Sequence, residues 1–529
     1  MKRIIMSFIL LTTIVIANGC ANKKIDPIII NKSSDSDIGE DIKYKIDKVN
    51  LSKSFQNIEP SIELVKKGLE YKLFISLGLI ESSGVEINNV KQVGHEVNIY
   101  VENQSDPKNS SLVVPQVVIS LKGSKSDKIE DYRFNVVNEN YSPIQVKFDI
   151  NEAINKINSE FNISTTTFPN INILSENDKI LWDLTYYSIF DKSNIQTPIM
   201  NLSVRIDANN GDIIESNKDF ISNFIDKGNI LDHVLGKYIL YRKVDNLDQN
   251  HNSRESLWYY NIESKEKALL YSSNAKIVSA KFNPNSKQIA ILESKDGNNE
   301  IYIIQDLDKK AFKVVFEDPI NPQIVRWNGR NNLYIVETNE KESNVYKHDI
   351  KKDKTLKIES LGKNITDLQI LGNNFLITEG DENNTKIHLT TNWKESLFYD
   401  FGSKAIFVND HQIAYLKHQN KENINMLYIY DINKSIRNNP IDANVVNCFP
   451  IWEDNIAVVQ KNQKNNNLSL NIYNTVEDKF TAITDVLSDN ISIFMDKDNI
   501  YIDLILPFNE ENIQMIYSID MNKIANLEP

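Results

Sequence analysis

The sequence predicts a mainly β protein whose repetitive C-terminal region follows one or more small α+β domains. The first observation is length, because 529 residues at about 150 per domain predict several domains. The second is a unit of about forty residues that recurs after residue 230. The third is the alternation of apolar and polar residues within this unit, which is typical of strands with one buried face.

Composition excludes several classes of protein. Hydrophobic residues make up 41% of the chain and charged residues 25%, which excludes a disordered, collagen-like or multi-span membrane protein. The formal charge of −13 argues against a basic nucleic-acid-binding surface, so we expect no nucleic-acid partner. Because the chain has only 16 glycines, its turns must use Asn and Asp, which tolerate left-handed backbone.

Residues 1–20, MKRIIMSFILLTTIVIANGC, have the layout of a secretory signal. Lys2 and Arg3 precede an apolar stretch, Ile4–Ala17, that is too short to span a bilayer comfortably. The pair Gly19-Cys20 resembles the bacterial lipoprotein box, which implies cleavage after Gly19 and a lipid on Cys20. An ordinary signal peptide and an uncleaved N-terminal anchor are the alternatives. We therefore expect a lipid-anchored protein on the extracytoplasmic face of a bacterial cell membrane.

Residues 21–50 are predicted to be a flexible tether. Their centre, SSDSDIGED, is polar, acidic and aperiodic, which is typical of linkers. The other cysteine, Cys448, lies in an apolar run and is predicted to be a buried small hydrophobic residue. If Cys20 carries a lipid, Cys448 has no partner within the chain, and the folded region must be stable without an internal disulfide.

The repeated unit begins with two strands joined by a turn, as in FNPNSKQIAILES (Phe282–Ser294). A tyrosine-rich strand that ends in a polar turn follows, as in EIYIIQDLDKK (Glu300–Lys310), and a short fourth strand usually comes next. One such sheet cannot bury both of its faces, so the units must pack radially and close into a ring. The count of units predicts a β-propeller of seven blades, or of six if an end unit is incomplete.

Residues 225–529 resemble the TolB-type propeller, a relative of the WD40-like propellers. The resemblance is concentrated in one unit, where Phe282-Asn283-Pro284-Asn285-Ser286 stands in place of the family's Trp-Ser-Pro-Asp-Gly opening. It implies the fold but no activity, because propellers serve as binding platforms, lyases and companions of hydrolases.

Residues 51–147 lack the repeat and are predicted to form a small β-rich domain. The segment Tyr71–Gln104 has the pattern of short strands joined by turns at Ser83-Gly84 and Gly94. This layout resembles the small domain of PrcB-type secreted proteins, with Ser83-Gly84-Val85 in place of their Gly-Gly-Tyr turn.

Residues 148–224 are predicted to form an α+β domain. The segment Asp149–Asn162 places apolar residues on one helical face, with Asp149 as the N-cap. A strand containing Trp182 and a final strand that enters an Asp-Ala-Asn-x-Gly turn follow. These features resemble a PepSY domain, a type that is usually non-catalytic and often accompanies secreted proteases. The matching residues are Trp182, Asp207, Ala208, Asn209, Gly211, Ile213 and Ile214. Asp207 is predicted to accept hydrogen bonds from the amides of its turn.

Motifs for common chemistry are absent from the sequence. It contains no G-x-S-x-G elbow, P-loop, H-E-x-x-H or C-x-x-C, and its seven histidines are spread singly. We therefore assign no catalytic residue and expect no metal or cofactor. Four tryptophans near blade ends are candidates for a ligand-binding rim: Trp258, Trp327, Trp393 and Trp452. Trp327 and Trp452 fall where blade-core residues are expected, so Trp393 is the binding candidate.

Two functional hypotheses from different classes follow. The first is a non-catalytic scaffold, anchored through its N-terminal lipid, whose propeller binds a protein, peptide or cell-envelope polymer. The second is a secreted propeller hydrolase or lyase that acts on peptides or glycans with funnel carboxylates. In a variant of the first hypothesis, the PepSY-like domain regulates an extracytoplasmic protease.

Overall fold

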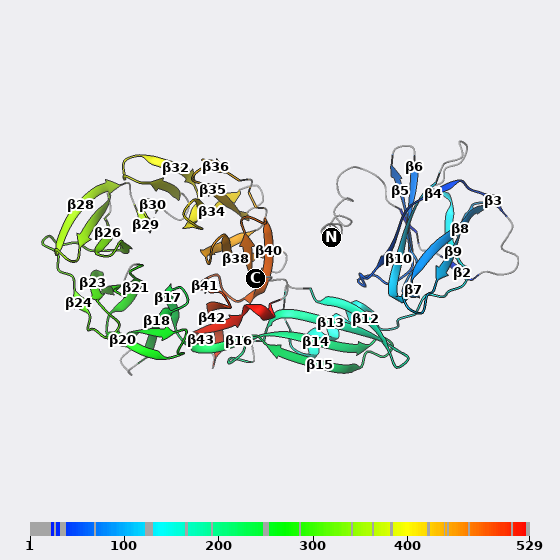
Figure 1. Ribbon diagram of the computed structural model, residues 1–529, viewed down its shortest axis with the longest axis horizontal. Coiled ribbons are helices and arrows are strands. Elements are labelled where there is room, and N and C mark those ends of the chain that lie inside the picture. Colours follow the sequence, from blue (N-terminus) through cyan, green and yellow to red (C-terminus); the bar gives the residue numbers. More distant parts are fainter. Residues whose placement is uncertain are drawn as a thin grey trace. The chain divides into compact units, whose positions relative to one another are not determined.

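The computed structural model describes most of the chain (Figure 1). The described residues are 23–25, 28–31, 39–67, 70–121, 131–163, 165, 168–191, 194–246, 253–284, 287–339, 342–361, 364–380, 385–419, 424–438, 440–441, 444–463, 466–508 and 511–524. The predicted cleavage site at Gly19 and the predicted lipidation site at Cys20 lie outside them. The chain divides into two compact units, the first comprising Met1–Phe161, Pro169–Thr185 and Ser203–Asn217 and the second comprising Asn162–Phe168, Tyr186–Leu202 and Lys218–Pro529.

The first unit begins with two sheets that share one core. Their strands are β1 (Lys23–Ile25), β2 (Ile28–Asn31), β3 (Glu40–Asp41), β4 (Tyr44–Ser52), β5 (Ser61–Lys67), β6 (Glu70–Ser76), β7 (Ile80–Ser82), β8 (Gly84–Val93), β9 (Glu96–Gln104), β10 (Ser111–Leu121) and β11 (Arg133–Asn138). One sheet has the order β1-β5-β6-β10-β4, with β7 also paired to β10, and the other has the order β2-β11-β9-β8-β3. Ile75 and Val117 from the first sheet join Ile99 and Phe134 from the second in one buried cluster. The expected β-rich domain is therefore a sandwich of two sheets.

Strands from the first fifty residues complete both of these sheets. β1 pairs with β5, β2 with β11, β3 with β8 and β4 with β10. The prediction of a flexible tether over residues 21–50 is therefore wrong for the strand-forming residues. These residues form strands because partner strands far along the chain supply the backbone hydrogen bonds. The polar local sequence gives no indication of such partners.

A helix and a four-stranded antiparallel sheet follow. These elements are α1 (Ile150–Glu160), β12 (Asn170–Glu176), β13 (Lys179–Phe190), β14 (Ile199–Asp207) and β15 (Ile213–Phe220), and the sheet follows chain order. Asp149 caps the helix as predicted, because its side chain accepts from the amides of Asn151 and Glu152 in a capping box. The indole of Trp182, fully buried in β13, donates to the carbonyl of Phe148 over 2.8 Å.

The turn after β14 has the predicted chemistry. The carboxylate of Asp207 accepts a hydrogen bond from the amide of Asn209 at 2.9 Å. Gly211 has a φ of +75°, and a Cβ at this position would lie 2.9 Å from the ring of Phe148. Both the left-handed backbone and the close ring require glycine here.

The second unit contains seven four-stranded antiparallel sheets arranged in a ring (Figure 1), so the chain forms a seven-bladed β-propeller. Blade 1 contains β17 (Asn229–Val234), β18 (Tyr238–Asn246), β19 (Ser253–Asn261) and β20 (Lys267–Ser273), and blade 2 contains β21 (Lys276–Phe282), β22 (Ile289–Lys295), β23 (Asn298–Ile304) and β24 (Phe312–Lys313). Blade 3 contains β25 (Ile324–Asn328), β26 (Asn332–Thr338), β27 (Ser343–Asp349) and β28 (Lys354–Leu361), and blade 4 contains β29 (Ile365–Leu371), β30 (Asn374–Glu379), β31 (Lys386–Thr390) and β32 (Ser396–Phe401). Blade 5 contains β33 (Ser403–Phe407), β34 (Gln412–Gln419), β35 (Ile424–Asp431) and β36 (Ile436–Arg437), and blade 6 contains β37 (Val445–Pro450), β38 (Asn455–Lys461), β39 (Leu468–Asn474) and β40 (Lys479–Val486).

Blade 7 closes the ring with a strand from the start of the unit. It contains β41 (Ile493–Met495), β42 (Asn499–Phe508) and β43 (Glu511–Asp520), followed by a short 3-10 helix, Met521–Lys523. β16 (Ser222–Lys227) pairs antiparallel with β43 and supplies the fourth, outermost strand. The predicted propeller boundary at residue 225 thus falls inside the closing strand.

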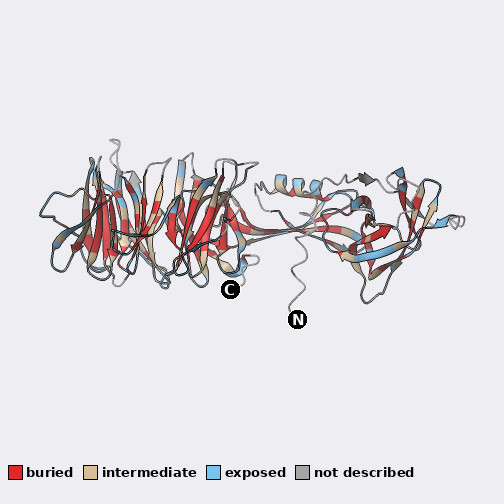
Figure 2. Ribbon diagram, turned by 90° about the horizontal axis from the view of Figure 1, so that it is seen from above, coloured by how far each residue is buried: buried red, intermediate tan, exposed pale blue. Residues whose placement is uncertain are grey.

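The propeller core lies between neighbouring blades. In Figure 2 the buried residues run along the blade strands, whereas many turn residues are exposed. Ile301 and Leu292 of blade 2 share one buried cluster with Val325 and Ile335 of blade 3. Similar clusters join the other neighbouring blades. Alternating apolar residues therefore face the adjacent blade on each side, as the repeat predicted.

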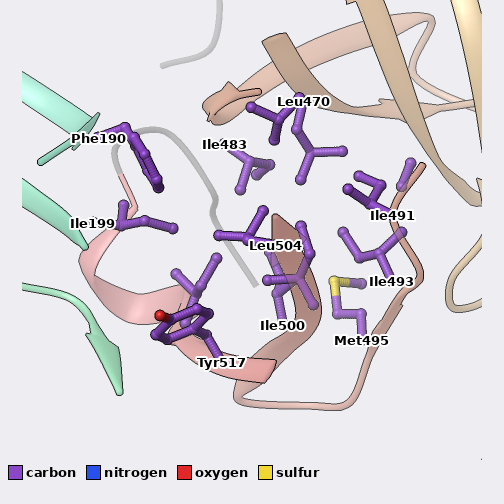
Figure 3. Close-up of a cluster of buried hydrophobic side chains, with 14 of the residues drawn as sticks. Phe190, Ile199, Leu470, Ile483, Ile491, Ile493, Met495, Ile500, Leu504 and Tyr517 are labelled. Atoms are coloured by element: carbon purple, nitrogen blue, oxygen red, sulfur yellow. The ribbon is translucent and has the colours of Figure 1, made fainter. Parts of the chain in front are cut away.

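The largest of these clusters extends beyond the blades. Phe190 at the end of β13 and Ile199 at the start of β14 pack with Leu504 and Tyr517 of blade 7 and Leu470 of blade 6 (Figure 3). The hydroxyl of Tyr517 also donates to the carbonyl of Ile195 over 2.7 Å. Residues before the first blade therefore belong to the propeller core.

Asn and Asp supply much of the left-handed backbone, as the scarcity of glycine predicted. Among the described non-glycine residues, fourteen have a positive φ, and eight of these are Asn or Asp. Asp296, Asp353 and Asp478 are examples in blade turns, each with a φ between 50° and 53°. Their short polar side chains tolerate this conformation better than other side chains do.

Candidate functional site

The innermost strands of the blades present one equivalent position toward the same end of the ring, called here the ring position. Antiparallel register places each of these residues opposite the second or third residue of its blade's next strand. Blades 1 to 4 place polar residues there and blades 5 to 7 place apolar ones. In order, these are Asp232, Lys281, Arg326, Gln369, Ile406, Phe449 and Phe494.

A pocket of about 950 Å³ lies over the polar part of this ring, in blades 1 to 4. Strands one and two, and strands three and four, are joined by turns at the same face of the propeller, because the strands are antiparallel. We call this face of the propeller the hairpin face. The pocket lies on it and is called here the hairpin pocket. Its lining residues are Asp232, His233, Val234, Leu235, Lys237, Tyr238, Asn261, Glu263, Lys281, Phe282, Asn283, Pro284, Lys287, Leu307, Arg326, Trp327 and Ile370.

Lys281 joins blade 2 to blade 1 at the pocket wall. Its ammonium donates to the carbonyl of Leu231 over 2.7 Å and lies 3.5 Å from the carboxylate of Asp232. That carboxylate also accepts from the amide of Phe282 at 2.7 Å. The Lys281 side chain is 33% exposed, so its positive charge reaches the pocket in an environment of reduced solvent screening.

Arg326 occupies the same position in blade 3 and is held from the other side. Its guanidinium donates to the carboxylate of Asp367 over 2.9 Å, and the amide of Gln369 donates to the same carboxylate over 2.9 Å. A guanidinium carries five donors, and a second terminal nitrogen donates to the carbonyl of Val325. Asp367 therefore orients Arg326 without occupying all of its donors.

His233 is an uncharged member of the lining. Its ring stacks on Phe494 with centroids 4.1 Å apart and an angle of 6° between the planes. Burial lowers the pKa of His233 below its usual value, against the opposing charge of Asp232. At neutral pH this histidine adds an aromatic surface rather than a charge.

The pocket has more cationic than anionic side chains. The lining cations are Lys237, Lys281, Lys287 and Arg326. The carboxylates of Asp232 and Glu263 in the lining, and that of Asp367 paired with Arg326, balance three of these charges and leave an excess of one positive charge, in a chain whose formal charge is −13. Apolar side chains complete the wall: Val234, Leu235, Pro284, Leu307 and Ile370. The arrangement suits a ligand that carries both negative charge and apolar surface.

Trp327 is a structural residue at the base of this wall. It is 6% exposed, and its indole donates to the carbonyl of Lys281 over 2.9 Å. The packing role that its place in the repeat predicted is confirmed. Trp452 packs partly against the core of blades 6 and 7 and also lines a second pocket of about 340 Å³ with Asp496 and Asp498. Leu235 lines both pockets.

Trp393, the rim candidate, lies in the turn between β31 and β32, on the hairpin face. Its ring is half-buried against Tyr334 and Phe375, with centroids 5.6 Å and 4.2 Å away. It does not line the hairpin pocket, so its role in ligand binding stays a prediction. Trp258 is also half-buried, and the ammonium of Lys243 lies 4.2 Å from its ring centroid.

Sequence reasoning missed the pocket, although a usable signal was present. When the repeats are aligned, Lys281, Arg326 and Gln369 fall in one column. Each is followed directly by an apolar residue of the innermost strand: Phe282, Trp327 and Ile370. Equivalent positions in successive blades are neighbours around the ring. A column that is polar in consecutive repeats therefore predicts one polar region, whereas a search for single-repeat motifs does not detect it.

The described residues offer no other constellation with obvious chemistry. No group of three or more His, Cys, Asp or Glu side chains among them is arranged to hold a metal ion. Cys448 is 3% exposed, and burial raises the pKa of its thiol to about 12, so the prediction of a buried hydrophobic role is confirmed. Within the described ranges, no helix has the length and apolarity needed to span a bilayer.

Comparison with known proteins gives likenesses in structure alone. No model of a protein family matches the sequence, and no curated protein matches it. The propeller domain of the Trilobed protease from Pyrococcus furiosus aligns with a TM-score of 0.41 and 12% identity, over 58% of this chain and 99% of that one. TolB from Acinetobacter baumannii aligns with a TM-score of 0.35 and 12% identity, over 66% and 86%.

An oligogalacturonate lyase from Vibrio parahaemolyticus aligns with a TM-score of 0.43 and 10% identity, over 61% of this chain and 97% of that one. These proteins differ in activity, and likenesses at this level assign none of their activities to this chain. The seven-bladed propeller rests on the strand pairing described above.

Proposed function

We propose that this protein is a non-catalytic binding protein, anchored by a lipid on Cys20 at the extracytoplasmic face of a bacterial membrane, whose propeller holds a protein, peptide or envelope polymer at the hairpin face. The observation that carries the binding function is the hairpin pocket. It is built by four successive blades, and its charged groups are held in place by neighbouring blades, as for Lys281 with Leu231 and Arg326 with Asp367.

Two features support binding over catalysis. Asp232, the carboxylate at the ring position of blade 1, already accepts from a backbone amide and lies beside Lys281, which suits a structural role more than a proton-transferring one. His233 is half-buried and stacked on Phe494, which leaves its ring poorly placed to exchange protons. The signal-like residues 1–20 support export, and the resemblance of residues 148–224 to PepSY domains fits a non-catalytic partner of other envelope proteins.

The binding face is tested by site-specific photocrosslinking in living bacteria. A photoreactive amino acid at Leu235, which is 49% exposed and lines both pockets, is expected to crosslink a discrete envelope component. The control is the same amino acid at Leu487, which is 46% exposed and follows β40, where the chain crosses to the next blade on the opposite face.

The two positions have matched exposure, so the contrast between them isolates the face. A product that forms from Leu235 and not from Leu487 supports the proposal. Equal crosslinking from both positions, or none from Leu235, contradicts it.

A further inference from the structure

The ring position differs in character between the two sides of the propeller. Polar side chains occupy it in blades 1 to 4 and apolar side chains in blades 5 to 7, and the hairpin pocket lies over the polar part. Two of the polar residues, Lys281 and Arg326, are cations on adjacent blades. A propeller whose inner strands were all alike would place no such charge excess on one side.

We infer that the hairpin pocket binds an acidic peptide segment of a partner protein, with peptide carboxylates paired to Lys281 and Arg326. The peptide's apolar side chains contact Leu235 and Tyr238. This inference rests on the proposed binding function and names the class of ligand that the same site takes.

Charge supports an anionic ligand. Asp232 lies beside Lys281 and accepts from the amide of Phe282, so the less exposed of the two lining carboxylates is already compensated within the wall. Lys237 and Lys287 lie in exposed turns at the mouth of the pocket. Cations at the mouth steer an acidic segment toward the site, against the repulsion from the rest of a chain with a formal charge of −13.

Geometry supports carboxylates as the charged groups. The Lys281 and Arg326 side chains are 33% and 24% exposed, so each is partly desolvated while still reachable. A guanidinium presents planar, paired donors that match a carboxylate, and Asp367 fixes its orientation before any ligand arrives. Pre-organised, partly buried cations of this kind give stronger ion pairs than mobile surface lysines do.

The apolar part of the lining favours a peptide over other anionic ligands. Leu235, Pro284 and Ile370 offer surface that gains free energy only when apolar groups cover it. A phosphate chain or a polyuronate has little apolar surface to bury there. A peptide in which acidic and apolar residues alternate satisfies both parts of the lining.

The test uses the full-length protein in detergent and an array of immobilised hexapeptides. One set alternates Leu or Val with Asp or Glu, a second replaces the acids by Asn or Gln, and a third replaces them by Lys or Arg. Binding is expected to concentrate in the acidic set. The best acidic peptide is then labelled and its affinity is measured by fluorescence anisotropy.

Variants locate the site. Lys281→Gln and Arg326→Gln are each expected to weaken peptide binding by about tenfold or more, because each removes a charge-assisted hydrogen bond. Lys281 and Arg326 also contact neighbouring blades, so their substitution could alter the fold as well as the charge. A second variant therefore combines Lys237→Gln with Lys287→Gln, two lysines in exposed turns at the mouth of the pocket. This variant is expected to slow the association of the peptide. The matched control is Lys497→Gln, which removes the same charge from the second pocket of the hairpin face and is expected to leave binding unchanged.

The outcomes separate this inference from the proposed function. Equal binding to all three peptide sets, or equal weakening by Lys497→Gln, overturns the inference. Displacement of the best peptide by polyphosphate or polygalacturonate at lower concentration than by unlabelled peptide also overturns it, in favour of a polymer ligand. If Leu235 crosslinks an envelope component while acidic peptides show no preference, the binding function stands and the acidic-peptide assignment falls.

Discussion

Asp503 is the carboxylate with the least exposure among the described residues, at 0%, and it lies where blade 7 meets blade 1. Its two oxygens accept from the amides of Ser492 and Ile230, at 2.6 Å and 2.7 Å. Burial raises the pKa of Asp503 to about 7, although these two hydrogen bonds favour the charged form. One carboxyl group therefore links the last blade to the first and titrates near neutral pH.

The free energy of unfolding of the propeller is expected to fall as pH rises toward 7, because Asp503 loses its proton over this range. A folded-state pKa above the unfolded value of about 3.9 means that protonation favours folding, so the contribution is full below about pH 4 and lost through about pH 7. The pKa difference corresponds to about 4 kcal/mol at most. Urea unfolding of wild type and Asp503→Asn, followed by tryptophan fluorescence, measures the effect.

The informative quantity is the difference in free energy of unfolding between the two proteins. It is expected to decline between pH 4.5 and 7 and to level off above about pH 7.5. Glu395→Gln, in the exposed turn before β32, serves as the control and is expected to give a difference that does not vary over this range. A pH-independent difference for Asp503→Asn would contradict the assignment.

At the scale of elements, β16 differs from every other strand of the propeller because its partners lie at the opposite end of the chain. Ile225 in β16 is 6% exposed and packs with Ile230 and Tyr241 of blade 1 and with Phe494 and Ile516 of blade 7. The seam between blades 7 and 1 thus depends on a strand that arrives before the first blade.

Ile225→Ala is expected to open this seam locally. Removing three methyl or methylene carbons from a buried isoleucine costs about 2–5 kcal/mol. Amide hydrogen exchange should accelerate in β43 and β17 together, because both strands border the lost packing. The control is Ile303→Ala, at another buried isoleucine, which is expected to accelerate exchange at the junction of blades 2 and 3 instead. Uniform acceleration over all blades in both variants would show that no separate seam exists.

At the scale of the whole molecule, the propeller is expected to act at the membrane surface only if the chain is lipidated at Cys20. In a bacterial host, wild type should fractionate with membranes and have an intact mass that begins at Cys20 and includes acyl chains. Cys20→Ala removes the thiol that would carry the lipid, and it should remain unprocessed or be released. If wild type and Cys20→Ala both gave soluble, unmodified protein, the proposed lipid anchor would be contradicted.

The repeat and its consequences were predictable from the sequence. Strand alternation and turn chemistry are local properties, so the four-stranded unit, the count of seven blades, the capped helix after Asp149 and the Asp207 turn all follow from neighbouring residues. Burial of Cys448 and Trp327 follows from their places in apolar, repeated strands. Each of these features is encoded within about forty residues.

Other features depend on contacts that no local pattern encodes. The strands at residues 23–52 exist because β5, β8, β10 and β11 pair with them. Ring closure by β16 joins segments at opposite ends of the propeller, and Asp503 meets the amide of Ile230 across 273 positions of sequence. Lys281 and Arg326 form one site because neighbouring blades hold equivalent positions side by side. The sequence alone determined the repeating element; the tertiary structure decided which residues converge, because burial and charge compensation are set by neighbours in space.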